Sequence, residues 1–437
     1  MQKDIVLFIN AIRPTTFDAL RAYNRQVEQQ LKPVVLVDAK IKASITERNS
    51  QKQLPDKVEV LTADFSSATS VCRVLLPYME RLFAVTAQYE NSIFELQRLV
   101  PFLPYLPMPT EQSLTWATEK KDMRRMLEAY DRSLVPRYID VTDASEISLD
   151  KIERMIPYPM IVKPSGLEGS LLVSLVNNTQ ELEAALHNTF EAMQGAYDKW
   201  IKRQEPAILV ESYMDGDMYS IDTYVTKNGD CYHTPPVKVM TGRKMGFDDF
   251  FAYTQSTPTD LTDRDLRNAE RAAEAACHAL GLRSVTAHVE MMKLDDAWKI
   301  IEVGPRVGGY RHELYSLSYG INHLMNDILN RAGQRPIIPK KIVSYTTILK
   351  IHAKEEGILV NTMGINEVCK LASYVSHKQA YEIGDEVMFA KNNGDPVYEF
   401  LLNNANQERL LEDIQCIEKA IHLAVAAPSF DIQHLFS

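Results

Sequence analysis

Short apolar runs alternate with amphipathic stretches over the first hundred residues of the chain. Residues 4–10 (DIVLFIN), 33–39 (PVVLVDA) and 82–90 (LFAVTAQYE) are largely apolar runs, a pattern typical of buried strands. Residues 91–100 (NSIFELQRLV) then carry apolar side chains at helical spacing. This alternation predicts a small, mostly parallel α/β unit over residues 1–110.

Two proline-rich segments divide the rest of the sequence. The segment 101–110 (PFLPYLPMPT) cannot continue a helix or a central strand, and 336–341 (PIIPKK) marks a second boundary. We therefore expect a chain of mixed α/β and α+β class with three domains. Their expected bounds are 1–110, 111–335 and 336–437.

Capping signals predict several later helices. Asn178 with Glu181 three residues on marks one start, and Thr262 marks the start of a helix over 263–280. A final helix is predicted from about 405 to 426. Its expected buried stripe consists of Leu410, Leu411, Ile414, Ile417 and Ile421.

Charge and composition narrow the function classes. The chain has 437 residues with a formal net charge of −10, so it lacks the basic field of a nucleic-acid-binding protein. No apolar run approaches the roughly 20 residues that span a bilayer, so no membrane partner is expected. The five cysteines show no CxxC spacing and fit a reduced, cytoplasmic protein.

The most informative segment is 287–309, where two apolar-alternating runs flank Asp295 and Asp296 and predict a hairpin. With the turn centred on Asp296, residues at equal distances before and after it face each other. The expected facing pairs are Leu294 with Trp298, Met292 with Ile300, Glu290 with Glu302, and His288 with Gly304.

Two facing acids in one sheet require a compensating cation, because like charges directly opposite each other destabilise strand pairing. Mg²⁺ fits best, since it takes one or two carboxylates and completes its shell with water and phosphate oxygens. Two alternatives remain: a bulge that turns one glutamate to solvent, or a general acid/base pair. We expect His288 to pack or orient a neighbour more readily than to bind metal.

Other candidate residues flank this pair. Arg306 follows the second acid within GPRVGG (304–309), where it could stabilise a transferring phosphoryl group. Lys163 ends an apolar strand before the loop 164–170, which suits nucleotide phosphates. Considered alone, this loop is typical of a surface turn. Considered alone, Lys120 is typical of a solvated side chain, and Glu211 of a residue that ends a strand.

In their order along the chain, these segments resemble the ATP-grasp superfamily of carboxylate–amine ligases over roughly residues 110–335, and the flanking regions resemble L-amino-acid ligases. The resemblance implies an ATP-grasp fold with an N-terminal α/β domain, a lid subdomain at about 155–225 and a C-terminal α+β domain. The implied nucleotide-binding residues are Lys120, Lys163, Gly169, Ser170, Glu211, Tyr213 and Asp217. The implied Mg²⁺ ligands are Glu290 and Glu302, with Arg306 and Lys163 in catalysis and His288, Gly308, Gly309 and Arg311 towards substrate.

The resemblance implies an enzyme that uses ATP with Mg²⁺, or Mn²⁺ in its place, to join a carboxylate, such as an amino acid, to an amine through an acyl-phosphate. It also suggests small-molecule substrates and a homodimer. The sequence departs from the family at Gly304, where Asn is usual, and at Met218, where an acid usually contacts ribose. These departures keep two alternatives open: a non-catalytic nucleotide-binding regulator, or a purine-pathway-like ligase or carboxylase.

Overall fold

The computed structural model describes residues 3–28, 30–40, 58–142, 148–167, 171–199, 207–295, 297–390 and 394–427. Its first unit is a four-stranded parallel sheet with the order β3-β2-β1-β4. The three predicted strands are confirmed, and β3 is an addition. The elements are β1 (Ile5–Ile9), β2 (Lys32–Asp38), β3 (Glu59–Ala63), β4 (Leu82–Thr86), α1 (Pro14–Asn24), α3 (Ala68–Leu75) and α4 (Ile93–Leu99).

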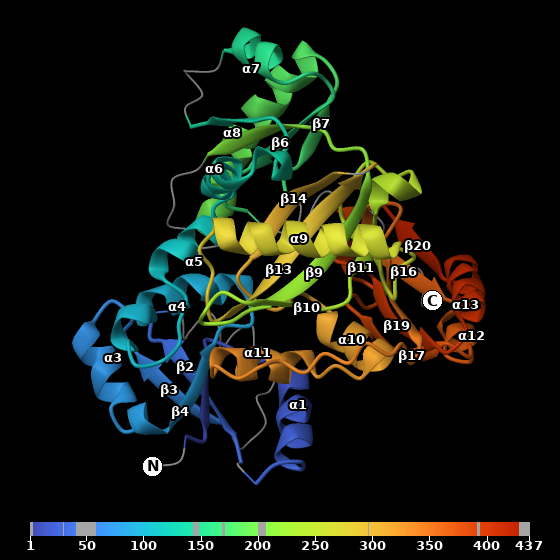
Figure 1. Ribbon diagram of the computed structural model, residues 1–437. Helices are drawn as coiled ribbons and strands as arrows, with labels where there is room; N and C mark the ends of the chain where they lie inside the picture. Colours follow the sequence, from blue (N-terminus) through green and yellow to red (C-terminus); the bar gives the residue numbers. More distant parts are fainter. Residues whose placement is uncertain are drawn as a thin grey trace.

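A second sheet forms the top of the molecule in Figure 1 and has the antiparallel order β5-β8-β6-β7. Two helices pack against it and bury Ile152, Ile156, Leu182 and Leu186. The predicted cap at Asn178 is confirmed, because its Oδ1 accepts a hydrogen bond from the Glu181 backbone nitrogen at 3.0 Å. The elements are β5 (Tyr138–Val141), β6 (Met160–Pro164), β7 (Ser174–Val176), β8 (Ile208–Ser212), α7 (Leu149–Met155) and α8 (Thr179–Lys199).

The central sheet is antiparallel and has the order β14-β13-β9-β11-β12-β15-β19-β17, with β10 paired to β9. Because β15, β17 and β19 lie in this sheet, the last hundred residues extend it. Its strands are β9 (Asp217–Val225), β10 (Cys231–His233), β11 (Val237–Thr241), β12 (Ala252–Thr257), β13 (Val285–Leu294), β14 (Ala297–Gly304), β15 (Tyr345–Ile351), β17 (Tyr374–Gln379) and β19 (Tyr398–Asn404).

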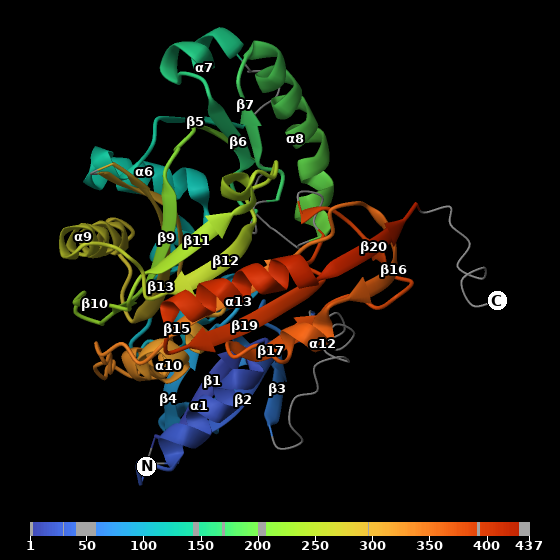
Figure 2. The same cartoon turned by 90° about the vertical axis from the view of Figure 1, so that its right-hand side faces the viewer.

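Helices cover both faces of the central sheet. Figures 1 and 2 show α9 (Asp263–Ala279) lying across one face, where it packs with α6 (Lys120–Tyr130) over β9, β13 and β14. The predicted Thr262 cap is confirmed by a 3.1 Å hydrogen bond from the Asp265 backbone nitrogen. The remaining helices here are α5 (Glu111–Thr118), α10 (Arg311–Tyr319) and α11 (His323–Arg331).

Helix α11 joins the central sheet to the N-terminal sheet. Its side chains Met325, Ile328 and Leu329 pack with Phe8 and Phe83 in one core cluster. This packing fixes the N-terminal unit beneath the central sheet (Figure 1). Among the described helices, none has the length and apolarity to cross a lipid bilayer.

The C-terminal region adds a small sheet of order β18-β16-β20 beside α13 (Gln407–Ala420). The predicted final helix ends too late: residues 422–426 form strand β20, which pairs with β16 and takes its backbone into a sheet. Leu411 is also misplaced in the predicted stripe, because it is 52% exposed. The other elements are β16 (Gly357–Met363), β18 (Glu386–Val387), β20 (His422–Ala426) and α12 (Ile365–Val368).

Candidate functional site: two facing glutamates in a cationic cavity

The predicted hairpin exists as β13 and β14, and Glu290 faces Glu302 as expected, with His288 facing Gly304. Nearer the turn, the expected register is wrong by one residue: Leu294 faces Ala297, and Met292 faces Lys299. The turn is tighter than expected, and a bulge between Glu290 and Met291 restores the predicted pairing beyond it.

The bulge leaves Ile301 as the extra residue of β14, since Met291 pairs with Ile300 and Glu290 with Glu302. Its carbonyl oxygen accepts a 2.8 Å hydrogen bond from the Arg124 guanidinium of α6. The bulge therefore has a partner and does not turn either glutamate away: both line the same cavity.

Basic side chains from two elements, α6 and β6, gather near the glutamates. Lys120 Nζ, at the start of α6, lies 3.3 Å from Glu302 Oε2 and donates to the Leu167 carbonyl at 2.7 Å. Lys163 Nζ, on β6, lies 2.6 Å from Glu211 Oε2, and Arg124 donates to the other oxygen of Glu211. Glu211 therefore forms ion pairs with both Lys163 and Arg124.

The surroundings of this cluster shift the pKa values of Glu211 and Lys163 for different reasons. Burial alone would raise the pKa of Glu211, but Arg124 and Lys163 outweigh it and lower that pKa to about 2. Burial, Arg124 and Lys120 together lower the pKa of Lys163 despite its pairing with Glu211. Arg124 and Lys163 share the single carboxylate of Glu211, so its negative charge does not fully offset the positive charge around Lys163. A bound anion would balance this charge.

The pKa of Glu211 predicts a specific pH dependence of stability. Because the folded value of about 2 lies below the ordinary 4.5, ionised Glu211 stabilises the fold above pH 4.5, and this contribution disappears as the pH falls towards 2. The shift corresponds to about 3 kcal/mol. We expect Glu211→Gln to be less stable than wild type at pH 7 and the difference to shrink steadily below pH 4.5, as measured by urea unfolding.

The matched control is Glu183→Gln, which removes an exposed glutamate of α8 in the same sheet-and-helix unit. It should leave the difference from wild type near zero at every pH. A Glu211→Gln deficit that stays constant from pH 7 to pH 2.5 would contradict the assigned ion pairing.

A buried polar network positions the other glutamate. His288 Nε2 lies 3.2 Å from Glu290 Oε1, and its Nδ1 lies 2.6 Å from Asp222 Oδ1. Asp222, fully buried on β9, also contacts His323 Nε2 at 2.6 Å and accepts from the Gly308 backbone nitrogen at 2.8 Å. His288 therefore lies between the two carboxylates and contacts both Asp222 and Glu290.

Burial disfavours the charged forms of His288 and Glu290, but their ion pairs and hydrogen bonds outweigh it. Burial would lower the pKa of His288, but Asp222 raises it above the ordinary value. Burial would raise the pKa of Glu290, but the hydrogen bond and charge of His288 lower it below the ordinary value. Glu290 therefore stays ionised and able to bind a cation at neutral pH.

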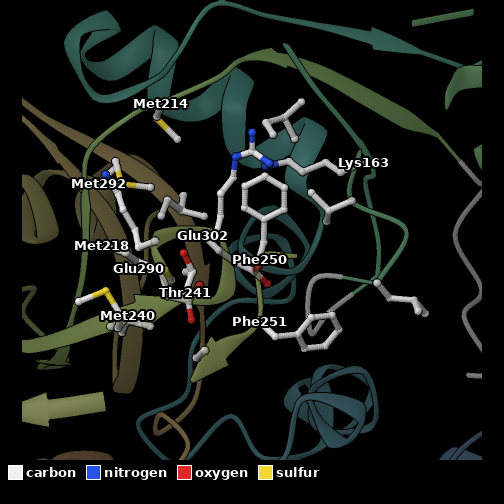
Figure 3. A pocket seen from close by; sticks show the side chains of 18 of the residues that line it. Lys163, Met214, Met218, Met240, Thr241, Phe250, Phe251, Glu290, Met292 and Glu302 are labelled. Carbon is white, nitrogen blue, oxygen red and sulfur yellow. The ribbon is translucent and has the colours of Figure 1, made fainter. Parts of the chain in front are cut away.

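The cavity between the sheets has a volume of about 590 Å³. In Figure 3, the labelled methionines lie on one side of the cavity, Glu290 and Glu302 lie near its centre beside Phe250, and Lys163 lies on the other side. This suits a ligand with one flat apolar part and one anionic part. The labelled methionines are Met214, Met218, Met240 and Met292.

Arg306 lines the cavity and is held by the N-terminal unit, because its Nε donates to Glu90 Oε2 at 2.6 Å. A Cβ at Gly304 would lie 3.3 Å from that same oxygen. The missing side chain at position 304 therefore leaves room for the Glu90 carboxylate at the end of β14.

The remaining predicted residues fall into three groups. Tyr213 and Asp217 line the cavity, as does Met218. Gly308, Gly309 and Arg311 do not line it: Arg311 is buried against Gln255 and Ser220 instead. Gly169 and Ser170 lie outside the described residues.

Sequence reasoning missed several residues of this site. Arg124 carried a signal, since it lies one helical turn after Lys120 and so shares its face of α6. Asp222 also carried one, as an acid inside the apolar run of β9. Glu90 and His323 carried none, because only the folded chain brings them here.

Residues 156–313 match the family described as the ATP-grasp domain. The two sheets that enclose the cationic cavity include strands from this matched segment, so this part of the chain is similar to an ATP-grasp domain. Among curated relatives, it is 24% identical to D-alanine–D-alanine ligase A of Bacillus cereus over 192 residues, 43% of this chain and 57% of that protein. The chain thus spans little more than half the length of this relative.

Solved structures show how far the fold extends. L-amino acid ligase from Bacillus licheniformis superposes with a TM-score of 0.76 at 17% identity, over 98% of this chain and 100% of that one. The biotin carboxylase domain of Hydrogenobacter thermophilus 2-oxoglutarate carboxylase, in complex with MgADP, ADP and bicarbonate, superposes at 0.63 with 13% identity, over 97% and 91%. At these identities the likeness establishes the fold, which is the expected ATP-grasp fold.

Proposed function

We propose that this protein is an ATP-dependent ligase that joins a carboxylate, of the amino-acid class, to an amine. The observation that carries the proposal is the pair Glu290 and Glu302, which face each other in a cavity that Lys120 and Lys163 also line. Facing acids suit a divalent cation, and undercompensated cations suit the phosphates that share it. The B. cereus relative and the B. licheniformis structure are both named as amino-acid ligases.

In this proposal Glu290 and Glu302 hold Mg²⁺, with Mn²⁺ as the alternative, which when bound offsets charge on the nucleotide phosphates. Lys120 and Lys163 bind and neutralise the triphosphate, and Glu211 keeps Lys163 in place. The substrate carboxylate attacks the γ-phosphorus to give an acyl-phosphate and ADP, and the amine then displaces phosphate. Arg306, oriented by Glu90, stabilises charge on the acyl-phosphate.

The base of ATP would occupy the methionine- and phenylalanine-lined end of the cavity, next to the backbone around Tyr213, with Asp217 beside the ribose. We further propose a lid role for the subdomain at about residues 155–225, because closure over the cavity would protect an acyl-phosphate from water. Cytoplasmic location and a homodimer complete the proposal, the former supported by five free cysteines.

The test is a screen for ADP and phosphate release with single amino acids, amino-acid pairs, polyamines and small carboxylates. We expect release only when a carboxylate and an amine are both present, with a coupled product of matching mass. ATP binding without amine-dependent ADP formation would instead select a regulatory nucleotide-binding protein. Release driven by bicarbonate or a purine-type amine would select the purine-pathway-like alternative.

A further inference from the structure

A second cluster of metal-binding side chains lies on the opposite face of the central sheet from the cavity. Cys231 begins the short edge strand β10, and Glu274 and His278 lie one turn apart near the end of α9. One potential ligand atom from each residue lies within 4.8 Å of the other two. The cluster therefore joins two elements that are distant in sequence.

The cluster is separate from the candidate nucleotide site. Cys231 pairs with Val225, which pairs with Val285, whereas Glu290 stands five residues further along β13, about 17 Å away at strand spacing. On β13, His288 and Glu290 line the cavity, but Val289 and Met291 pack on the α9 side. A metal held by α9 thus lies across the sheet from the glutamate pair.

The geometry fits a tetrahedral zinc ion. Typical bonds of about 2.3 Å to sulfur and about 2.0 Å to nitrogen place two such ligand atoms roughly 3.5 Å apart. In this structure Cys231 Sγ and His278 Nε2 are 3.8 Å apart, so a shift of a few tenths of an ångström suffices. Spacing of four residues puts Glu274 and His278 on one face of the helix.

The chemistry of the ligands also selects the metal. A thiolate and an imidazole favour Zn²⁺ over Mg²⁺, which prefers oxygen ligands. His278 Nε2 now contacts the Gly229 carbonyl at 2.9 Å, so metal binding would replace a proton at that atom.

We propose that Cys231, Glu274 and His278 form a zinc-binding site, with water as the fourth ligand, that ties β10 to the end of α9. Such a tie would brace the edge of the sheet where β10 pairs with β9. The site is independent of the ligase proposal, because none of its residues lines the cavity.

The test is to strip the full-length protein of metal and titrate it with Co²⁺, which reports thiolate ligation by a charge-transfer absorption band. We expect one Co²⁺ per chain with this band, its displacement by Zn²⁺, and a higher melting temperature with Zn²⁺. Cys231→Ser should remove the band, and His278→Gln should weaken binding about 10-fold or more. Circular dichroism and cooperative urea unfolding in EDTA would show that both variants are folded.

Two matched controls remove an exposed thiol and an exposed imidazole elsewhere: Cys369→Ser and His422→Gln. Both should titrate like wild type. Glu302→Gln should also keep the band, since its site offers no thiolate. The proposal is overturned if the wild-type protein shows no thiolate band, if the band persists in Cys231→Ser, or if it disappears in Cys369→Ser.

Discussion

Glu302→Gln is expected to lower substrate-dependent phosphate release by about 100-fold or more while leaving the protein folded. The glutamine keeps the shape of the side chain but cannot supply the charge that a divalent cation requires, a loss comparable to removing one electrostatic group from an active site. Glu302 is partly exposed, and its described ion pair is with Lys120, which keeps its bond to the Leu167 carbonyl. The unfolding free energy should therefore change by only about 1 kcal/mol.

The control for this variant is Glu412→Gln, which breaks an exposed ion pair with Arg409 on α13, remote from the cavity. It should leave both turnover and stability unchanged. Phosphate release by Glu302→Gln at a rate near that of the wild type would remove the metal role from this residue and, with it, the main support for the ligase proposal.

Asp222→Asn is expected to have the largest effect on stability, a loss of about 3–5 kcal/mol in urea or guanidinium unfolding. The carboxylate is fully buried and contacts His288, His323 and the Gly308 backbone nitrogen. An amide has one oxygen to accept hydrogen bonds, and its NH₂ group would face one of these nitrogens, so a buried donor loses its partner.

The same substitution should reduce turnover even at temperatures where the variant is folded. His288 would lose the partner that orients it, so Glu290 would be less well placed, and half-saturation should require more Mg²⁺. The control is Asp230→Asn, an exposed acid just beyond β9 whose described side-chain bond, to Thr226, is 3.3 Å long. Unchanged stability and Mg²⁺ dependence in Asp222→Asn would contradict the positioning role.

The facing glutamates show how local and tertiary information combined. The sequence predicted the pair from a turn centred on Asp296, but the turn is tighter by one residue, and a bulge at Ile301 compensates for it. The bulge is stabilised by Arg124 of α6, which lies 177 residues away in sequence. Hydrophobic alternation does not reveal such a distant hydrogen-bond donor. The predicted pairing of Glu290 with Glu302 was correct because the error in the turn and the unpredicted bulge cancel each other.

The end of the chain shows the opposite case. The periodicity of residues 407–420 correctly predicts α13, yet the five residues from His422 form a strand. Short apolar runs are compatible with either structure, and here pairing with β16 decides. Leu411 has the spacing of a core residue, but it is exposed, and no element of the described part of the chain covers it.

By itself, the sequence determined the local structure: the parallel strands of the first unit, the caps at Asn178 and Thr262, and a hairpin that carries two opposed acids. These follow from contacts between residues near each other in the chain, which spacing and residue type encode. Only the tertiary structure decided which charges meet. Glu90 reaches Arg306 across 216 residues and Asp222 reaches His323 across 101, because packing of α11 and the sheets, not local pattern, brings them together.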